Sequence, residues 1–131
     1  MSDELQPQTF RITRADLIRY AGASGDFNTI HWSDRIATSV GLPGVIAHGM
    51  FTMALVGRAV TAWAGAPDAV AEFSVRFSRP VPVPDTDEGT EVVVSATVKE
   101  ITGDGQTRLN LTATCNGEKV LSLAQALIRK R

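Results

Sequence analysis

The segment His48–Ala64, with the sequence HGMFTMALVGRAVTAWA, constrains the fold more than any other part of the chain. Its only obligate charge is Arg58, and apolar or small side chains fill the other faces of a helical wheel. We therefore expect a helix that is buried on most sides. Such a helix is about 25 Å long, which matches the width of a sheet of about five strands spaced ~4.8 Å apart. The segment predicts a helix wrapped by a curled antiparallel sheet.

The sequence ahead of this helix predicts a short strand over residues 9–12 and another helix directly after it. Thr13 and Asp16 resemble a capping box with Asp in place of Glu, so that helix should begin just after Thr13. We expect it to end in a tight turn made by Gly22 and Gly25. Its predicted apolar side consists of Leu17, Ile18 and Ala21.

Residues 24–31 follow as a loop in which polar side chains are interleaved with Phe27 and Ile30. We expect these two apolar side chains to anchor the loop by being buried. Ser33 is a suitable N-cap for a second short helix that runs through about Val40. From there the chain turns into the long helix.

Beyond Pro67 the apolar period changes from helical to two, which predicts the strands of an antiparallel meander. The expected strands lie at about 71–77, 91–101, 109–115 and 120–128. The side chains expected to face the core are Ala71, Phe73, Val75 and Phe77, then Val92, Val94, Ala96 and Val98, then Leu109, Leu111, Ala113 and Cys115. The alternating prolines at 80, 82 and 84 predict an extended segment with poor strand pairing.

Two features indicate how the last strands are arranged. Asn116-Gly117 predicts a type I′ hairpin turn. The strand over residues 120–128 is apolar on both faces, so it is either central in the sheet or covered by another subunit. The order of elements predicts an α+β protein, and it fits a hotdog fold, in which a curled antiparallel sheet wraps a long central helix.

The composition predicts a single domain over residues 1–131, because a chain of this length with 44% hydrophobic residues can bury one core. A formal net charge of −1 argues against nucleic acid or an anionic membrane as a partner. The first residues lack the pattern of a signal peptide, and the one cysteine, Cys115, cannot form an internal disulfide. We therefore expect a cytoplasmic protein. The long helix is also too short and too interrupted by polar residues to span a bilayer.

Asp26 and His31 are the candidate catalytic side chains. Both can change charge near neutral pH, so together they can activate a water molecule. Asn28 between them can hold the loop through hydrogen bonds to the backbone. The Gly49 N–H at the start of the long helix lacks a helical acceptor and is a candidate oxyanion donor. Such a group suits the addition or elimination of water next to a polarised carbonyl, where an enolate forms.

Two motifs carry a family resemblance. The run YAGASGDFNTIH at residues 20–31 resembles the hydratase motif of the MaoC-like (R)-specific enoyl-thioester hydratases and dehydratases, and AHGM at 47–50 resembles their second signature. With VRF at 75–77 and VPVP at 81–84, the chain looks most like the short catalytic subunit of actinobacterial 3-hydroxyacyl-carrier-protein dehydratases.

The resemblance implies a hotdog fold, dimers that join two sheets, and an acyl channel near the dimer interface. It implies that Asp26 and His31 are the catalytic pair and that the Gly49 N–H binds the thioester carbonyl. Asn28 and His48 are the candidate substrate-binding residues, Asn28 as the organiser of the loop and His48 because it lies next to the donor. His48 is also compatible with packing at the helix N-terminus or capping it. The implied substrate is an acyl-CoA or acyl-carrier-protein thioester, with no metal or redox cofactor. The partner is another hotdog chain, in a homodimer or a heterodimer.

Two positions depart from the family pattern. Thr29 stands where family members usually have Pro, so the loop lacks one fixed φ. Gly57 stands in the long helix where some hydratases have Ser, although the dehydratase subunits accept Gly.

Other interpretations remain beside hydration of an enoyl thioester. Asp26 and His31 are also compatible with a purely structural pair in a non-catalytic hotdog subunit that binds an acyl chain or stabilises a catalytic partner. Such a subunit has no need of the complete set of Asp26, Asn28 and His31. A hotdog thioesterase needs a water directed at the carbonyl carbon, and the motif is not typical of that group.

Overall fold

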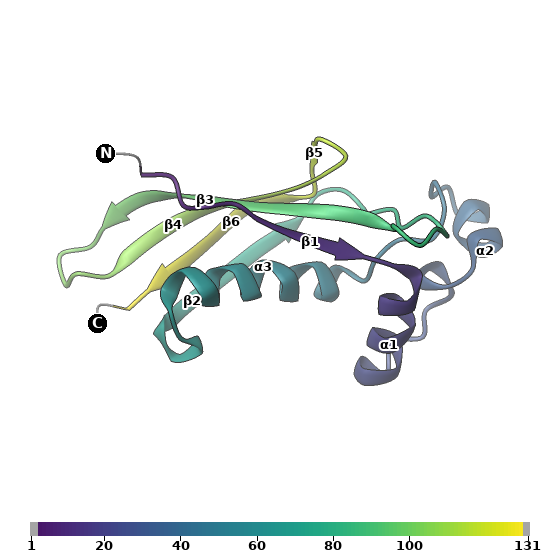
Figure 1. Ribbon diagram of the computed structural model, residues 1–131, viewed down its shortest axis with the longest axis horizontal. Helices are drawn as coiled ribbons and strands as arrows, with labels where there is room; N and C mark the ends of the chain where they lie inside the picture. The colour runs from purple at the N-terminus through teal and green to yellow at the C-terminus, as the bar shows by residue number, and fades with distance from the viewer. Residues whose placement is uncertain (1–2, 130–131) are drawn as a thin grey trace.

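The computed structural model describes residues 3–129, which form one curved antiparallel sheet with a long helix along its face (Figure 1). The strands, in their order across the sheet, are β1 (Gln8–Ile12), β3 (Thr90–Ile101), β4 (Thr107–Cys115), β6 (Leu121–Ile128) and β2 (Val70–Phe77), with the short β5 (Glu118–Lys119) paired to β4. The long helix is α3 (Gly49–Ala64). The shorter helical elements are α1 (Arg14–Ser24), the 3-10 turn η1 (Thr29–His31), α2 (Asp34–Ser39) and the 3-10 turn η2 (Pro67–Ala69).

The core lies between α3 and the sheet, as the sequence predicts. The helix buries Leu55, Val56, Ala59 and Val60. The strands β3 and β4 bury the side chains that alternate along them, namely Val92, Val94, Ala96, Leu109, Leu111, Ala113 and Cys115. Each fully buried Val or Leu contributes about 1.5–3 kcal/mol relative to an exposed one. Burial of this continuous apolar layer therefore holds the helix on the sheet.

The helix α1 begins at Arg14 behind the predicted capping box, in which the Asp16 N–H is bonded to the Thr13 side chain and the Thr13 N–H to the Asp16 carboxylate. Two expectations about α1 are wrong. Ile18 is 57% exposed, because only the stripe that contains Leu17 and its i+4 neighbour faces the core. The first of the two glycines also lies inside the helix, which ends only at Gly25 in the left-handed conformation.

The loop after α1 does not bury Phe27, whose side chain is 63% exposed, so the predicted apolar anchor at this position is wrong. The loop is held there by a polar contact instead, since the Phe27 carbonyl accepts a hydrogen bond from Trp32 Nε1 at 3.0 Å. Ile30 is partly buried. Ser33 caps α2 as predicted, with its hydroxyl accepting from the Ile36 N–H.

The hairpin turn and the central place of the last strand agree with the sequence. Asn116 and Gly117 both have positive φ values, 53° and 78°, as a type I′ turn requires. The strand β6 lies between β4 and β2, which is the central position that the sequence offered as one of two alternatives, although its Leu123 side chain is 70% exposed.

Two of the predicted core positions of β2 are wrong. Phe77 is about half exposed beside the start of α3. Ala71 lies at a register shift between Val70 and Glu72, and Val70 packs on the core in its place.

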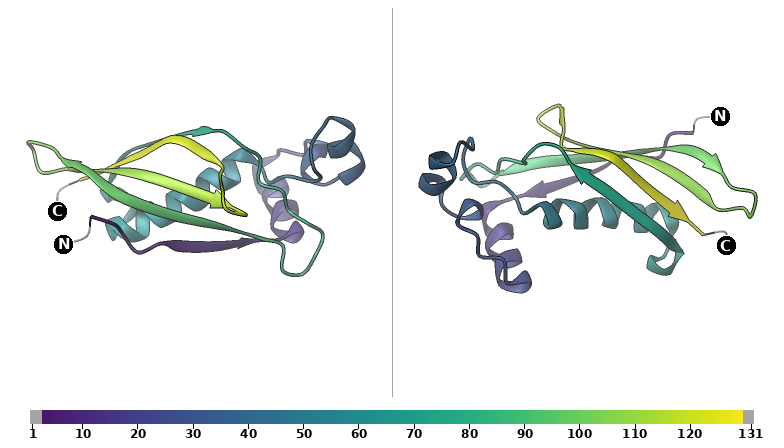
Figure 2. Two further views of the ribbon diagram at one scale, coloured as in Figure 1. Left: turned by 90° about the horizontal axis from the view of Figure 1, so that it is seen from above. Right: turned by 180° about the vertical axis from the view of Figure 1, so that it is seen from behind.

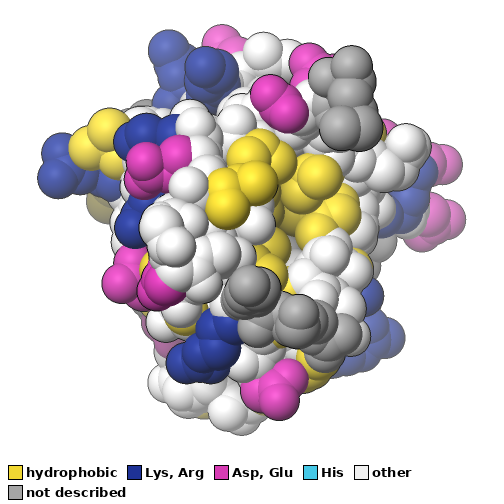
Figure 3. Space-filling view, turned by 90° about the vertical axis from the view of Figure 1, so that its left-hand side faces the viewer, with side chains coloured by type: hydrophobic (Ala, Val, Ile, Leu, Met, Phe, Trp, Pro, Cys, Tyr) yellow, Lys and Arg dark blue, Asp and Glu magenta, His cyan; other side chains and the backbone are white. Residues whose placement is uncertain are grey.

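The two ends of the molecule differ in their helices and in the side chains on their surface. In both views of Figure 2, α1 and α2 lie beyond one end of the sheet, next to the N-terminus of α3. The opposite end, shown in Figure 3, has hydrophobic side chains at its centre and charged ones around them, and no histidine is visible on that face. None of the helices formed within residues 3–129 has the length and hydropathy needed to cross a membrane. Asp26 and His31 lie between α1 and α2, and Gly49 begins α3, so the candidate site is at the end that carries α1 and α2.

Candidate active site

The loop that carries Asp26 is shaped by its own short polar side chains. One Asp26 carboxylate oxygen, Oδ1, accepts a hydrogen bond from the Asn28 N–H at 3.1 Å. The Asn28 side-chain oxygen in turn accepts from the Ile30 N–H at 3.3 Å and caps η1. These are Asx turns, in which a side chain replaces a backbone acceptor. Asn28 thus organises the loop, as the sequence predicts.

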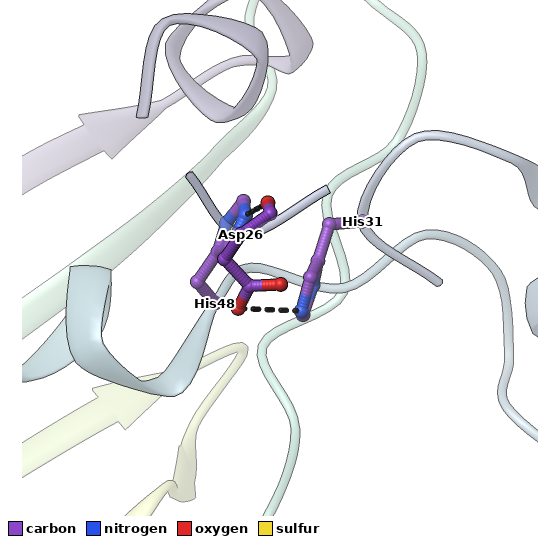
Figure 4. A group of neighbouring side chains, drawn as sticks. All are labelled: Asp26, His31 and His48. Atoms are coloured by element: carbon purple, nitrogen blue, oxygen red, sulfur yellow. Dashed lines mark hydrogen bonds and ion pairs between the residues drawn. The ribbon is translucent and has the colours of Figure 1, made fainter. Parts of the chain in front are cut away.

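His31 ends η1 with its side chain buried and its two ring nitrogens in different environments. Nδ1 lies 2.8 Å from the Ile46 carbonyl oxygen, which can only accept, so Nδ1 carries a proton. In the neutral ring Nε2 is then the unprotonated nitrogen. Nε2 faces the Asp26 carboxylate, 4.0 Å from Oδ2, and that carboxylate is 51% exposed (Figure 4). The pair predicted from the sequence is therefore brought together, with the basic nitrogen of His31 on the side of Asp26.

His48 lies directly behind this pair. Its side chain is 2% exposed, and its ring is stacked on that of His31 with the centroids 3.9 Å apart and the planes inclined by 22°. Nε2 of His48 donates to the main-chain carbonyl of Asp26 at 3.1 Å, and the Tyr20 and His48 rings pack edge to face with their centroids 4.8 Å apart. Burial lowers the pKa of His48, because the charged form loses its hydration. Burial thus disfavours the charged form of this enclosed ring.

Gly49 is the first residue of α3 and lies in the wall of a cavity of about 380 Å³ that His31 also lines. The cavity wall includes Ile46, Thr52, Phe77, Arg79 and Val120 as well. A Cβ at Gly49 would lie 3.2 Å from the Phe77 ring, so the absence of a side chain lets that ring close over the helix N-terminus. The backbone at this point presents N–H groups without helical acceptors and the positive end of the helix dipole. The arrangement suits a developing negative charge in the cavity.

The same cluster offers three potential metal ligands, one atom each from Asp26, His31 and His48, all within 4.8 Å of one another. The ring geometry argues against a shared metal ion. Imidazole lone pairs lie in the ring planes, and two stacked, nearly parallel rings do not direct them to one point. One nitrogen of each ring is also bonded to a carbonyl oxygen. The group is better suited to moving protons than to holding a metal.

Several lining residues were not predicted from the sequence. Thr52 follows Gly49 by almost one turn of α3, and this helical spacing is a signal that would have found it. Arg79 and Ser78 reach the cavity only because the chain after β2 returns past the start of α3. The Ile46 carbonyl fixes the tautomer of His31, and no side-chain pattern indicates a backbone acceptor.

A family model described as MaoC like domain matches residues 2–114. The chain belongs to this family. The family resemblance carried by the two sequence motifs is thereby confirmed.

Relatives and solved structures extend the comparison of this MaoC-like chain. It is 50% identical to 3-hydroxyacyl-thioester dehydratase X of Mycobacterium tuberculosis over 76 residues, which are 58% of this chain and 26% of the relative. It is 29% identical over 120 residues to the 3-hydroxybutyryl-CoA dehydratase of Methylorubrum extorquens, covering 90% of this chain and 73% of the relative. A solved structure of a MaoC-like dehydratase superimposes with a TM-score of 0.94 at 39% identity, over 99% of this chain and 40% of that one.

These matches confirm the predicted α+β hotdog architecture. They also show a difference in length. The MaoC-like chain spans about a quarter of the M. tuberculosis dehydratase and 40% of the solved dehydratase chain.

Proposed function

We propose that this chain catalyses the reversible hydration of trans-2-enoyl thioesters to (R)-3-hydroxyacyl thioesters, or the reverse dehydration, in fatty-acid or polyketide metabolism. The observation that carries the proposal is the pairing of the Asp26 carboxylate with Nε2 of His31, 4.0 Å apart, beside a cavity that His31 and Gly49 line. The dehydratase relatives support the same chemistry.

The proposed reaction is a balanced addition of water. Asp26 and His31 activate a water molecule between them, one of the two taking its proton while the hydroxide adds to C3. The electrons of the double bond move onto the thioester carbonyl as an enolate, which the Gly49 N–H stabilises. A proton delivered by the pair to C2 then completes the hydroxyacyl product. Dehydration follows the same steps in reverse.

The substrate is an acyl thioester carried on CoA or on an acyl carrier protein, and the proposed steps use no metal or redox cofactor.

Association with a second hotdog chain, as a homodimer or a heterodimer, is part of the proposal. The side of α3 that faces away from the sheet supports it, because Met50, Ala54, Arg58 and Ala62 are exposed there. We also propose that the protein is cytoplasmic, as the sequence predicts.

The test is a direct assay of hydration. The absorbance of the conjugated enoyl thioester is followed with crotonyl-CoA and with a longer trans-2-enoyl-CoA, for the wild type beside Asp26→Asn and His31→Ala. We expect both variants to lose about 10²–10⁴-fold in kcat, which is the usual contribution of a general acid or base. Val94→Ala, a core change in β3 away from the cavity, is the control for loss of stability alone. Equal rates in all proteins, or release of free thiol in place of hydration, would overturn the proposal.

A further inference from the structure

His48 connects three parts of the candidate active site. Its main chain caps α3 immediately before Gly49, its Nε2–H bonds the carbonyl of Asp26, and its ring lies under that of His31. We propose that His48 is a positioning residue, whose ring holds the Asp26 backbone and the His31 imidazole so that the Asp26 carboxylate and Nε2 of His31 face each other. This inference rests on the proposed hydration reaction and adds a role that the two catalytic side chains do not fill.

The direct contact between His48 and substrate that the sequence predicts does not fit the surroundings of its side chain. The side chain is 2% exposed, and it is enclosed by the Tyr20 ring, the His31 ring and the Asp26 carbonyl. Its effect on the reaction therefore passes through the residues it touches.

The bond to Asp26 is one of the contacts that tie this loop to the start of the central helix. The other hydrogen bonds of Asp26 join it to Ser24 and Asn28, each two residues away, and these shape the loop without placing it. The bond from His48 spans 22 residues. Together with the bond from the Ile46 N–H to the Ile30 carbonyl, it holds the loop against the N-terminus of α3.

The stack with His31 restrains the other half of the pair. The Ile46 carbonyl holds one edge of the His31 ring, and the face of His48 covers one side of it. Rotation of the His31 ring would break both contacts. Nε2 is thus kept pointing at the carboxylate and not toward the protein interior.

The second ring nitrogen of His48, Nδ1, indicates that the residue does more than fill space. Nδ1 is buried and has no hydrogen-bond partner among residues 3–129. An unpaired buried acceptor is unfavourable, and an apolar ring of similar size fills the same space without it. The feature that a histidine supplies here is the donor to the Asp26 carbonyl.

Two substitutions separate the donor from the aromatic face. His48→Phe keeps a ring under His31 and loses the donor, whereas His48→Gln keeps a donor and loses the ring. We expect His48→Phe to lower kcat for crotonyl-CoA by about 10²-fold, the usual effect of a small misplacement of reacting groups. KM should stay within threefold, since the residue does not contact substrate, and His48→Gln should recover part of the loss. Val94→Ala serves again as the folding control.

A structural measurement makes the test independent of turnover. Imidazole ¹⁵N spectra of the wild type should show His48 with a protonated Nε2. In His48→Phe, the resonances of the Asp26 backbone and of the His31 ring should shift far more than they do in Val94→Ala. Full kcat in His48→Phe beside inactive Asp26→Asn would overturn the positioning role and leave the hydratase proposal intact. A wild type without hydratase activity would overturn the proposed reaction. If the Asp26 and His31 resonances also stayed unmoved in His48→Phe, the positioning role of His48 would be overturned as well. If His48→Phe fails to fold, His48→Gln with the same spectra decides the question.

Discussion

The imidazole rings of His31 and His48 lie stacked with their centroids 3.9 Å apart, although one ends a 3-10 turn and the other caps the central helix. This contact joins the loop that carries Asp26 to the helix that carries the Gly49 N–H. The candidate acid–base pair and the candidate oxyanion donor are thus parts of one packed unit.

Gly49→Ala should lower activity more than stability. The new Cβ lies 3.2 Å from the Phe77 ring, which is about half exposed and can move, but the movement narrows the cavity. We expect kcat/KM for crotonyl-CoA to fall about tenfold, or ~1.4 kcal/mol in transition-state stabilisation. Gly22→Ala is the matched control, because its Cβ meets nothing within 4 Å inside α1. That change should keep full activity and stabilise the protein by about 0.5–1 kcal/mol, and equal activity losses in both variants would contradict the prediction.

The pH dependence of stability should reflect His48. Burial lowers its pKa in the folded protein below the ordinary value of 6.5. Below that value the unfolded chain takes up a proton that the folded protein does not, so stability is lost as the pH falls toward the folded pKa. The free energy of unfolding, measured with urea between pH 7.5 and 5.5, should decrease more steeply in the wild type than in His48→Gln. The difference is at most about 1.4 kcal/mol per pH unit, the effect of one proton, and parallel curves would rule out His48 as its source.

Thr29→Pro should be tolerated and stabilising. Thr29 is the first residue of η1, and no hydrogen bond within residues 3–129 uses its N–H. The preceding Asn28 has φ −54° and ψ 130°, a conformation that a following proline favours. Proline should therefore restrict the unfolded chain and raise the free energy of unfolding by about 0.4–1 kcal/mol. Thermal unfolding measures the gain, while a loss of stability would show that the loop needs a freer backbone than this geometry indicates.

Gly89→Ala should be strongly destabilising. The residue has a φ of 59°, and a Cβ there would lie 1.9 Å from the Ile12 carbonyl oxygen, which is fixed in β1. Because backbone and not a flexible side chain blocks the space, we expect a loss of more than about 2 kcal/mol. Gly103→Ala has free space and should change stability by less than about 0.5 kcal/mol. Urea midpoints of the two variants compare them directly, and similar values would refute the clash at Gly89.

Predictions from local pattern agree with the structure where neighbouring residues decide the outcome. The capping box at Thr13, the Asn116-Gly117 turn and the alternating core faces of β3 and β4 all depend on chemistry within a few residues. Burial of Ile18 and Phe27 was predicted wrongly, because their exposure depends on how far the sheet and α3 extend over α1 and the loop after it. The spacing of apolar residues within one segment does not show which other segments of the chain will cover it.

The sequence by itself determined the long apolar helix, the α+β class and the motif that pairs Asp26 with His31. Only the tertiary structure decided what holds that pair in place. The Ile46 carbonyl that fixes the tautomer of His31, the stacked ring of His48 and the cavity wall at Arg79 come from separate segments. Periodicity and turn chemistry act over a few residues, whereas these contacts exist only after the apolar face of α3 has packed on the sheet and brought the segments together.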